Sequence, residues 1–573
     1  MRDVFRSGLI VGLLCSLCFS QSNVQPPLAS QGQGPANLST AATPSTPPVY
    51  TNALGEAREL YRKGDFEGAI GKYQLFLQEH AGSPDAYAGI ARVYLKQKKL
   101  DLAAVTVAQG LTQSDAPRLH VALGEVLFRQ GKIPEAEQEW VKVIQIGVPD
   151  ARAYLGLARV RDAIAMYKTA EKLIAKAHEL DPSDPDVKEA WVGTLSRNER
   201  IKYLEATLAG ENNWNKEERE GAESYLKYLR ERAKLPNRQC RLVSKVTTTS
   251  TPLVRLLRDP THLRAYGLSV SLNGHKSDLL LDSGASGITV KRSIAERAGV
   301  TKISETKIGG VGDKGMKDAY IGIVDSMRIG ELEFHDCAID IMEKGSVGDE
   351  DGLIGSDVFS DFLVELDFPN EMLKLGELPK RPGEAEKKLG LEGEDEDDSA
   401  DSLSSPANAT ADASNKKEVV PPANVSHRQD RYIAPEMKEY TRIFRFGHYL
   451  LVPTKIGNVP PKLFLLDTGA FNNTISPAAA REVTKVRSDE SIITGLSGSV
   501  KKVYTANKTV LEFGGLRQEN QDMIAFDDAN LSDEAETEIS GFLGFAMLRF
   551  LDIKIDYRDA LVSFSFDPKR WGM

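Results

Sequence analysis

The sequence predicts a multidomain protein of α plus all-β class, in which a helical repeat array is followed by two β lobes. Three observations support this prediction. The first third of the chain repeats small and apolar residues at a period near 34, the texture changes to short β-branched runs near residue 240, and one aspartate-centred motif occurs twice in the β part. A chain of 573 residues is too long for one hydrophobic core, so several folded units are expected.

Composition narrows the class of function. The chain is 41% hydrophobic and 27% charged, with a formal net charge of −10. The first two values are ordinary for globular protein, and the negative balance argues against a nucleic-acid surface. We therefore expect no nucleic-acid partner.

The first residues have the composition of a secretion signal. Arg2 and Arg6 give a positive start, and residues 8–19 form an apolar stretch of 12 residues, too short to span a bilayer. Residues 1–20 are therefore predicted to be a signal peptide and the mature protein to be secreted or periplasmic. An uncleaved membrane anchor is the alternative. Residues 21–50 are rich in Pro, Ser, Thr and Gln, which predicts a disordered linker.

A helical repeat is predicted over residues 53–182. Small residues recur at intervals of 34, 33 and 34 positions, at Ala69, Ala103, Ala136 and Ala170. Gly64 and Gly131 mark the turns between paired helices. This spacing resembles the tetratricopeptide repeat, whose usual role is to dock a protein partner. A spacer that binds nothing is the alternative. Residues 183–237 are predicted to be a helical cap.

The two β segments, residues 240–378 and 433–570, are copies of each other. Residues 379–432 between them hold an acidic run and form a predicted low-complexity linker, since they lack the ligand spacing of a calcium loop. Both copies place a glycine 28 residues after the central aspartate, and both place an apolar pair and a glycine further on. The matched residues are Asp282-Ser283-Gly284-Ala285 with Asp467-Thr468-Gly469-Ala470, Gly310 with Gly495, and Gly355 with Gly544.

Together these motifs resemble the retropepsin-like family of aspartic proteases. The resemblance implies that each copy is a β-barrel lobe supplying one aspartate, and that the two lobes form a pseudo-dimer. It also implies roles for the neighbouring residues. Ser283 and Thr468 would brace the two loops, assisted by Gly284, Ala285, Gly469 and Ala470. Flaps over bound peptide would contain Gly310, Gly312, Gly495 and Gly498, while Gly355 and Gly544 would pack beneath the loops.

Asp282 and Asp467 are the predicted catalytic pair. Two carboxyl groups held close together share one proton, so that one can activate water while the other protonates the substrate carbonyl. The predicted function is an aspartic endopeptidase acting on a polypeptide substrate, with lobes that pair within the chain. The alternatives are pairing with a second molecule and a non-catalytic peptide-binding scaffold.

No cofactor is expected. The eight histidines include no H-E-x-x-H pair, and the cysteines lack the spacing of a zinc site. After signal cleavage Cys240 and Cys337 would remain, and the sequence leaves open whether they form a disulfide or stay as buried thiols.

Overall fold

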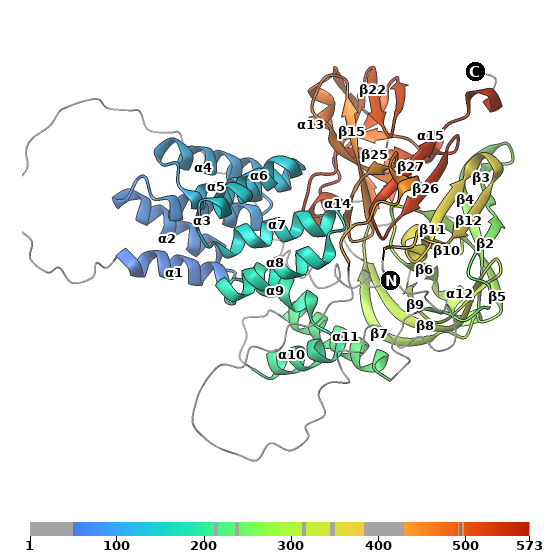
Figure 1. The fold of residues 1–573 in the computed structure, drawn as a ribbon, viewed down its shortest axis with the longest axis horizontal. Coiled ribbons are helices and arrows are strands. Elements are labelled where there is room, and N and C mark those ends of the chain that lie inside the picture. Colours follow the sequence, from blue (N-terminus) through green and yellow to red (C-terminus); the bar gives the residue numbers. More distant parts are fainter. Residues whose placement is uncertain are drawn as a thin grey trace, which may run out of the picture.

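The computed structural model describes residues 50–210, 216–234, 240–311, 317–343, 350–382, 429–490, 492–495 and 498–571. A helical array is followed by two β lobes (Figure 1), which confirms the predicted fold class. The predicted signal peptide lies outside the described residues. Among the helices that are described, none is long and apolar enough to cross a membrane.

Within the described residues, the array consists of four helix pairs. Its helices are α1 (Tyr50–Arg62), α2 (Phe66–Glu79), α3 (Pro84–Lys96), α4 (Leu100–Gln113), α5 (Pro117–Arg129), α6 (Ile133–Gln145), α7 (Ala151–Ala163) and α8 (Tyr167–Leu180). The four recurring alanines are at most 1% exposed, because small residues allow the helices to approach closely. One residue with positive φ makes the turn within each pair: Gly64, Lys98, Gly131 and Ala165.

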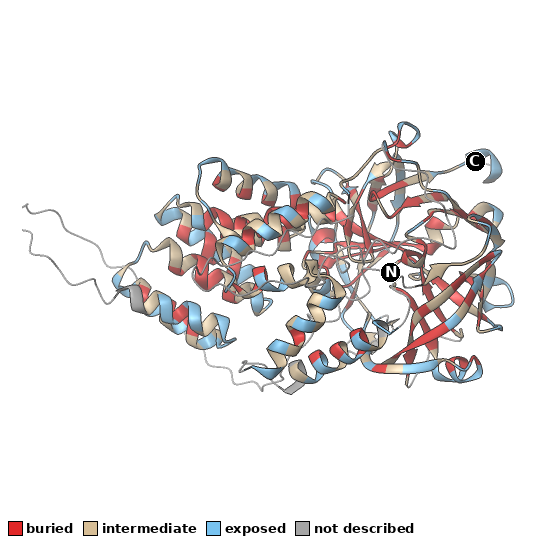
Figure 2. Ribbon diagram, turned by 60° about the horizontal axis from the view of Figure 1, so that its bottom comes forward, coloured by how far each residue is buried: buried red, intermediate tan, exposed pale blue. Residues whose placement is uncertain are grey.

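Three further helices connect the array to the first lobe. They are α9 (Pro185–Thr194), α10 (Arg197–Ala209) and α11 (Lys216–Arg232). Leu204 and Tyr228 share an apolar cluster with Ile321 of lobe 1. The Ser224 hydroxyl also donates a hydrogen bond of 2.6 Å to the carbonyl of Glu305. The helical cap is therefore packed on lobe 1. Figure 2 shows buried residues inside the array and along the strands of both lobes.

Lobe 1 is a closed barrel. Its elements are β1 (Arg241–Leu242), β2 (Thr249–Pro252), β3 (Val254–Asp259), β4 (His262–Leu272), β5 (His275–Asp282), β6 (Ile288–Lys291), α12 (Arg292–Arg297), β7 (Thr301–Ile308), β8 (Lys317–Ile329), β9 (Leu332–Met342), β10 (Gly352–Gly355), β11 (Leu363–Asp367) and β12 (Met372–Gly376). The main sheet runs β1-β9-β6-β10-β5-β4-β8-β7, and the additional pairing of β8 with β9 closes it.

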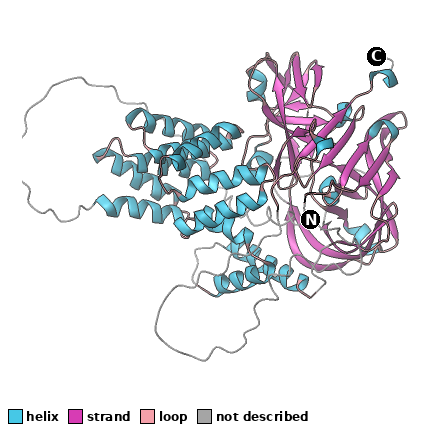
Figure 3. Ribbon diagram, viewed as in Figure 1, coloured by secondary structure: helices cyan, strands magenta, loops and turns pink. Residues whose placement is uncertain are grey.

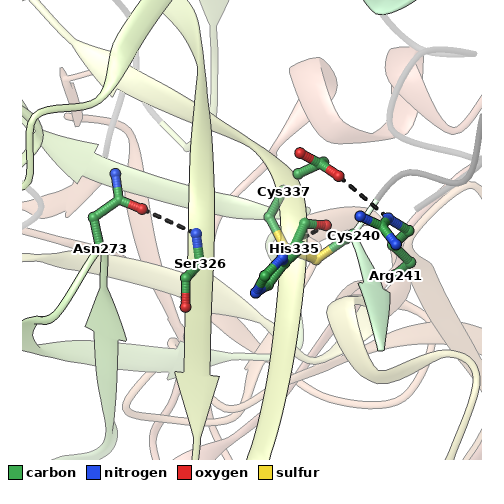
Figure 4. Close-up of a disulfide and its surroundings, with 7 residues drawn as sticks. Cys240, Arg241, Asn273, Ser326, His335 and Cys337 are labelled. Atoms are coloured by element: carbon green, nitrogen blue, oxygen red, sulfur yellow. Dashed lines mark hydrogen bonds and ion pairs between the residues drawn. A yellow bond between two sulfur atoms is a disulfide. The ribbon is translucent and has the colours of Figure 1, made fainter. Parts of the chain in front are cut away.

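A disulfide fixes the entry of the chain into lobe 1. Cys240 is bonded to Cys337 of β9, across 97 residues of sequence (Figure 4). Beside it, Arg241 forms an ion pair of 3.2 Å with Asp336. The structure thus decides between the two states that the sequence left open, in favour of the disulfide.

Lobe 2 repeats the same plan. Its elements are β13 (Thr441–Arg442), β14 (Phe444–Phe446), β15 (Tyr449–Ile456), β16 (Lys462–Asp467), β17 (Thr474–Ile475), α13 (Pro477–Arg481), β18 (Val486–Asp489), β19 (Ile493–Gly495), β20 (Gly498–Val500), β21 (Val503–Ala506), β22 (Thr509–Phe513), β23 (Leu516–Asn520), β24 (Met523–Ala525), α14 (Ala529–Glu534), β25 (Gly541–Gly544), α15 (Phe545–Leu548), β26 (Asp552–Asp556) and β27 (Leu561–Ser565). Strands and helices of both lobes are distinguished by colour in Figure 3.

One sheet joins the lobes. Its order is β13-β27-β26-β11-β12-β2, and the two lobes meet where β11 pairs antiparallel with β26. The main apolar cluster also spans both lobes and includes Leu281 and Leu466, which directly precede the two aspartates. The lobes therefore form an internal pseudo-dimer with a shared core.

The ends of the segment between the lobes lie close to each other. The Arg381 side chain donates a hydrogen bond of 3.2 Å to Gln429 and forms a buried ion pair of 2.5 Å with Asp559. Nearby, Arg558 donates to the Pro379 carbonyl at 2.8 Å. Asp430 accepts bonds of 2.9 and 2.7 Å from Thr169 of the array. Both ends are thus anchored independently of the residues between them.

Replacing residues 383–428 by about six Gly and Ser residues should preserve the fold, because each residue spans up to about 3.5 Å and the anchored ends are adjacent. We expect the thermal midpoint and any peptidase activity to match the parent chain. As a control, a protease recognition site can be inserted into the intact segment. After cleavage there, the two fragments should still elute together in gel filtration. Separation of the lobes in either protein would contradict the anchoring.

Candidate active site

The two aspartates end equivalent strands at the centre of the molecule. Asp282 is the last residue of β5 and Asp467 the last of β16. Each strand pairs in parallel with a short strand of its own lobe, so that Gly355 lies beside Asp282 and Gly544 beside Asp467. The apolar strands leave the carboxyl groups at the boundary between the lobes.

The structure brings the two carboxyl groups into contact. Each carboxylate lies against the glycine of the opposite loop, and the charge of Asp467 acts on Asp282. Each also accepts backbone hydrogen bonds from its own loop: Asp282 from Gly284 at 2.9 Å, and Asp467 from Gly469 and Ala470 at 2.9 and 2.8 Å. We refer to Asp282 and Asp467 as the dyad.

The glycine of each loop lies against the aspartate of the other lobe. A Cβ atom on Gly284 would come within 2.8 Å of the Asp467 carboxyl carbon, and one on Gly469 would overlap the Asp282 carboxylate. Real Cβ atoms do not approach so closely, so the absence of a side chain at both positions is what allows the dyad to form.

Two hydroxyl side chains connect the loops reciprocally. The Thr468 hydroxyl accepts from the Ser283 amide at 2.9 Å and donates to the Leu281 carbonyl at 2.9 Å. The Ser283 hydroxyl accepts from the Thr468 amide at 3.0 Å and donates to the Leu466 carbonyl at 2.8 Å. Ser283 is 1% and Thr468 2% exposed, so this network is shielded from water.

Burial and mutual repulsion shape the ionisation of the dyad. Burial raises the pKa of Asp282, and the charge of Asp467 raises it further. Burial also raises the pKa of Asp467, while its loop amides act in the opposite direction. The last proton therefore stays on the pair to a higher pH than it would stay on an isolated aspartate, and the pair titrates as a unit.

Two side chains that the sequence did not single out hold the loops differently in the two lobes. In lobe 1, Asp357 accepts from the Gly287 amide at 2.9 Å and from the Ser286 hydroxyl at 3.2 Å. Ala546 occupies the equivalent position of lobe 2. There Asn473 accepts from the Gly544 amide at 2.7 Å instead. In lobe 1 the corresponding Gly355 amide donates to the Gly287 carbonyl at 2.7 Å, so the Asn473 side chain takes the place of a backbone acceptor.

The glycine-rich turns also meet. Gly495 and Gly498 pair with each other in a hairpin of β19 and β20. Gly495 lies against the backbone of Val311 in the neighbouring turn of lobe 1, next to Gly310. Val311, Ile493 and Val500 pack in the same apolar cluster as Ala470 of the Asp467 loop. Gly312, predicted to belong to the first flap, lies outside the described residues.

Two aromatic side chains of lobe 2 border the dyad. Tyr449 lies close enough to Asp467 for that carboxylate to contribute to the raised pKa of the phenol, after burial and Glu534. The His448 ring contacts that of Tyr449 in a tilted arrangement, with centroids 3.9 Å apart and planes at 50°, and burial lowers the pKa of this imidazole. Neither residue belongs to a motif shared by the two copies, so no sequence pattern pointed to them.

Comparison with protein families agrees with both resemblances inferred from the motifs. Residues 268–358 and 452–546 match the model described as aspartyl protease, once in each lobe. Residues 54–116 match the tetratricopeptide repeat model. The chain therefore carries two copies of an aspartyl-protease-like domain behind tetratricopeptide repeats.

Individual relatives cover parts of the chain. The UBA domain-containing protein Mud1 of Schizosaccharomyces pombe is 32% identical over 111 residues, which cover 19% of this chain and 32% of that protein. The chain thus spans about a third of the length of this relative. A thermophilic tetratricopeptide repeat protein of Thermus thermophilus matches with 18% identity and a TM-score of 0.23, covering 28% of this chain and 90% of that one. The pilF protein of Pseudomonas aeruginosa matches with 19% identity and a TM-score of 0.23, covering 32% of this chain and 86% of that one.

Proposed function

We propose that this protein is an aspartic endopeptidase in which Asp282 and Asp467 form one catalytic dyad. The observation that supports the proposal most strongly is the contact between the two carboxyl groups, each supplied by a different lobe and braced by reciprocal hydrogen bonds. A structural aspartate does not require a buried partner of the same charge, since bringing two such groups together is unfavourable.

The proposed reaction uses the proton that the pair shares. The unprotonated carboxylate accepts a proton from a water molecule, whose oxygen attacks the peptide carbonyl carbon. The protonated partner hydrogen-bonds the carbonyl oxygen and stabilises the charge that develops there. The tetrahedral intermediate then collapses, the C–N bond breaks, and the departing amine takes up a proton from the dyad. An extended peptide would bind beneath the two glycine turns through backbone hydrogen bonds.

We further propose that the mature protein works in a secreted or periplasmic setting. The apolar stretch at residues 8–19 supports this, and so does the disulfide between Cys240 and Cys337, because such bonds persist in oxidising compartments. The repeats would offer a surface for a protein partner. A peptide-binding scaffold without catalysis is the alternative, and the following experiment separates the two.

Digestion of an unfolded test protein should give a bell-shaped pH profile within about pH 3 to 7. Activity should fall on the acid side as the second carboxyl group takes up a proton. On the alkaline side it should fall as the shared proton is lost, above the usual aspartate pKa because burial raises the pKa of both groups. Products would be read by mass spectrometry.

A peptide substrate without titratable side chains provides the control for substrate ionisation. Peptide capture without products at any pH would favour the scaffold, and activity that increases beyond about pH 8 would contradict a shared-proton dyad.

A further inference from the structure

The loop that leads into β25 differs between the two lobes. In lobe 1 the corresponding connection, between β9 and β10, consists of residues 343–351. In lobe 2 it consists of residues 526–540 and contains α14. The longer connection reaches the helical array near α7 (Figure 1). The two halves of the cleft therefore have different surroundings. We call residues 533–538 the docking segment.

The docking segment is held by the array through side-chain and backbone contacts. Glu536 forms ion pairs with Arg129 at 2.9 Å and with Arg159 at 3.1 Å. The Thr537 hydroxyl donates to the Phe128 carbonyl at 2.7 Å, and the Glu538 amide donates to the Arg129 carbonyl at 3.0 Å. These array residues lie on α5 and α7. A third cation reaches the start of the segment, where Lys98 pairs with Asp533 at 2.5 Å.

Glu536 fits this position electrostatically. Burial alone would raise the pKa of its carboxyl group, but Arg129, Arg159 and Lys96 outweigh burial and lower the pKa to about 2. Its φ of 55° lies in the left-handed region, which is unfavourable for a residue with a side chain and persists only where surrounding contacts fix it.

The same loop also reaches the dyad. Glu534, the last residue of α14, accepts a hydrogen bond of 2.9 Å from the Tyr449 hydroxyl. Asp528 caps the start of α14, and the Asp467 charge is among the causes that raise its pKa. Tyr449 packs with Leu465, which lies two residues before Asp467 and hence on the same side of β16. That apolar cluster also includes Phe128 and Trp140 of the array.

From these contacts we propose that the array acts in cis on the catalytic cleft, and that Glu536 is a positioning residue which fixes α14 and Tyr449 beside Asp467. The inference rests on the proposed peptidase function. In this arrangement the chain's own docking segment covers the surface of the array that α5 and α7 form. A separate protein would then bind elsewhere on the repeats or would have to displace the segment.

The test compares Glu536→Gln with the parent chain by peptide cleavage and by amide hydrogen exchange. Glutamine keeps the shape and loses the charge. We expect kcat to fall about tenfold or more with little change in KM, because misplaced groups beside a catalytic centre reduce the rate of the chemical step. We also expect faster exchange over residues 449–452 and 529–534. Asp522→Asn is the matched control, since Asp522 pairs with Arg487 on the exposed surface of lobe 2.

Exchange that increases only within the array and the docking segment, with kcat unchanged, would overturn the proposal. Should Glu536→Gln not fold, Arg159→Gln removes one of the two ion pairs of Glu536 from the array side and should give the same pattern with a smaller effect. Exchange at Tyr449 needs no catalysis. If the parent chain cleaves nothing, the peptidase assignment fails, while the exchange result still decides whether Glu536 positions the cleft.

Discussion

Asp282→Asn and Asp467→Asn should each abolish peptide cleavage by the full-length chain. The two carboxyl groups meet at the lobe boundary, and in the proposed mechanism they share one proton, so neither could act as base or acid without the other. General acid–base groups contribute about 10²–10⁴-fold each, and groups that act as a unit lose nearly all activity when one is removed. We therefore expect losses of at least about 10³-fold for both variants.

The isosteric substitution Asp325→Asn provides the control, because Asp325 lies exposed on β8 of lobe 1, the lobe that contains Asp282. It should cleave like the parent chain. A dead Asp282 variant beside an active Asp467 variant would mean that lobe 1 pairs with its counterpart in a second molecule. Full activity in both variants would show that Asp282 and Asp467 are not catalytic.

The duplicated motif made the central part of this site predictable from the sequence. Asp282 and Asp467 each follow an apolar strand and precede a glycine, and such a pattern places a carboxylate at a strand end with a tight turn behind it. The repeat period predicted the helix pairs for a similar reason, since Ala69 and its counterparts recur wherever two helices must approach closely.

What escaped prediction depends on contacts between distant segments. Left-handed turns occur at Gly64 and Gly131, where the glycine makes them predictable from the sequence. They occur also at Lys98 and Ala165, whose residue types do not indicate such a turn. Glu536 is one of many acidic residues in the sequence. Its position between Arg129 and Arg159 arises from packing between lobe 2 and the array, which no local pattern records.

Asp357 and Asn473 illustrate a second limit. Each holds its own loop through an amide that the other lobe treats differently, and neither has a counterpart, because position 546 of lobe 2 is alanine and position 288 of lobe 1 is isoleucine. Comparing the two copies shows that these positions differ, but not which backbone amide each side chain binds. The duplicated motif therefore predicts the two aspartates and their loops, but not the side chains that hold the loops in place.

Thr468→Val should strongly weaken the joint between the lobes. Valine matches threonine in shape but removes both hydrogen bonds of the hydroxyl, leaving the Ser283 amide and the Leu281 carbonyl without this partner inside the protein. Each unsatisfied buried group costs about 1–3 kcal/mol, so the free energy of unfolding should fall by about 2–5 kcal/mol. Denaturant unfolding would measure this loss. Activity should also fall, since the hydroxyl fixes the loop that carries Asp467.

Thr454→Val is the matched control for this substitution. Thr454 is also buried in lobe 2, but its hydroxyl donates only to the Val452 carbonyl of the same strand, at 3.0 Å. Its loss should be smaller and should not affect the lobe boundary. Because the four hydrogen bonds of Ser283 and Thr468 form one network, the Ser283→Ala/Thr468→Val double variant should lose less stability than the sum of the single variants. Strict additivity would mean that the two hydroxyls act separately, and that the dyad is held together by the shared sheet and core rather than by its own loops.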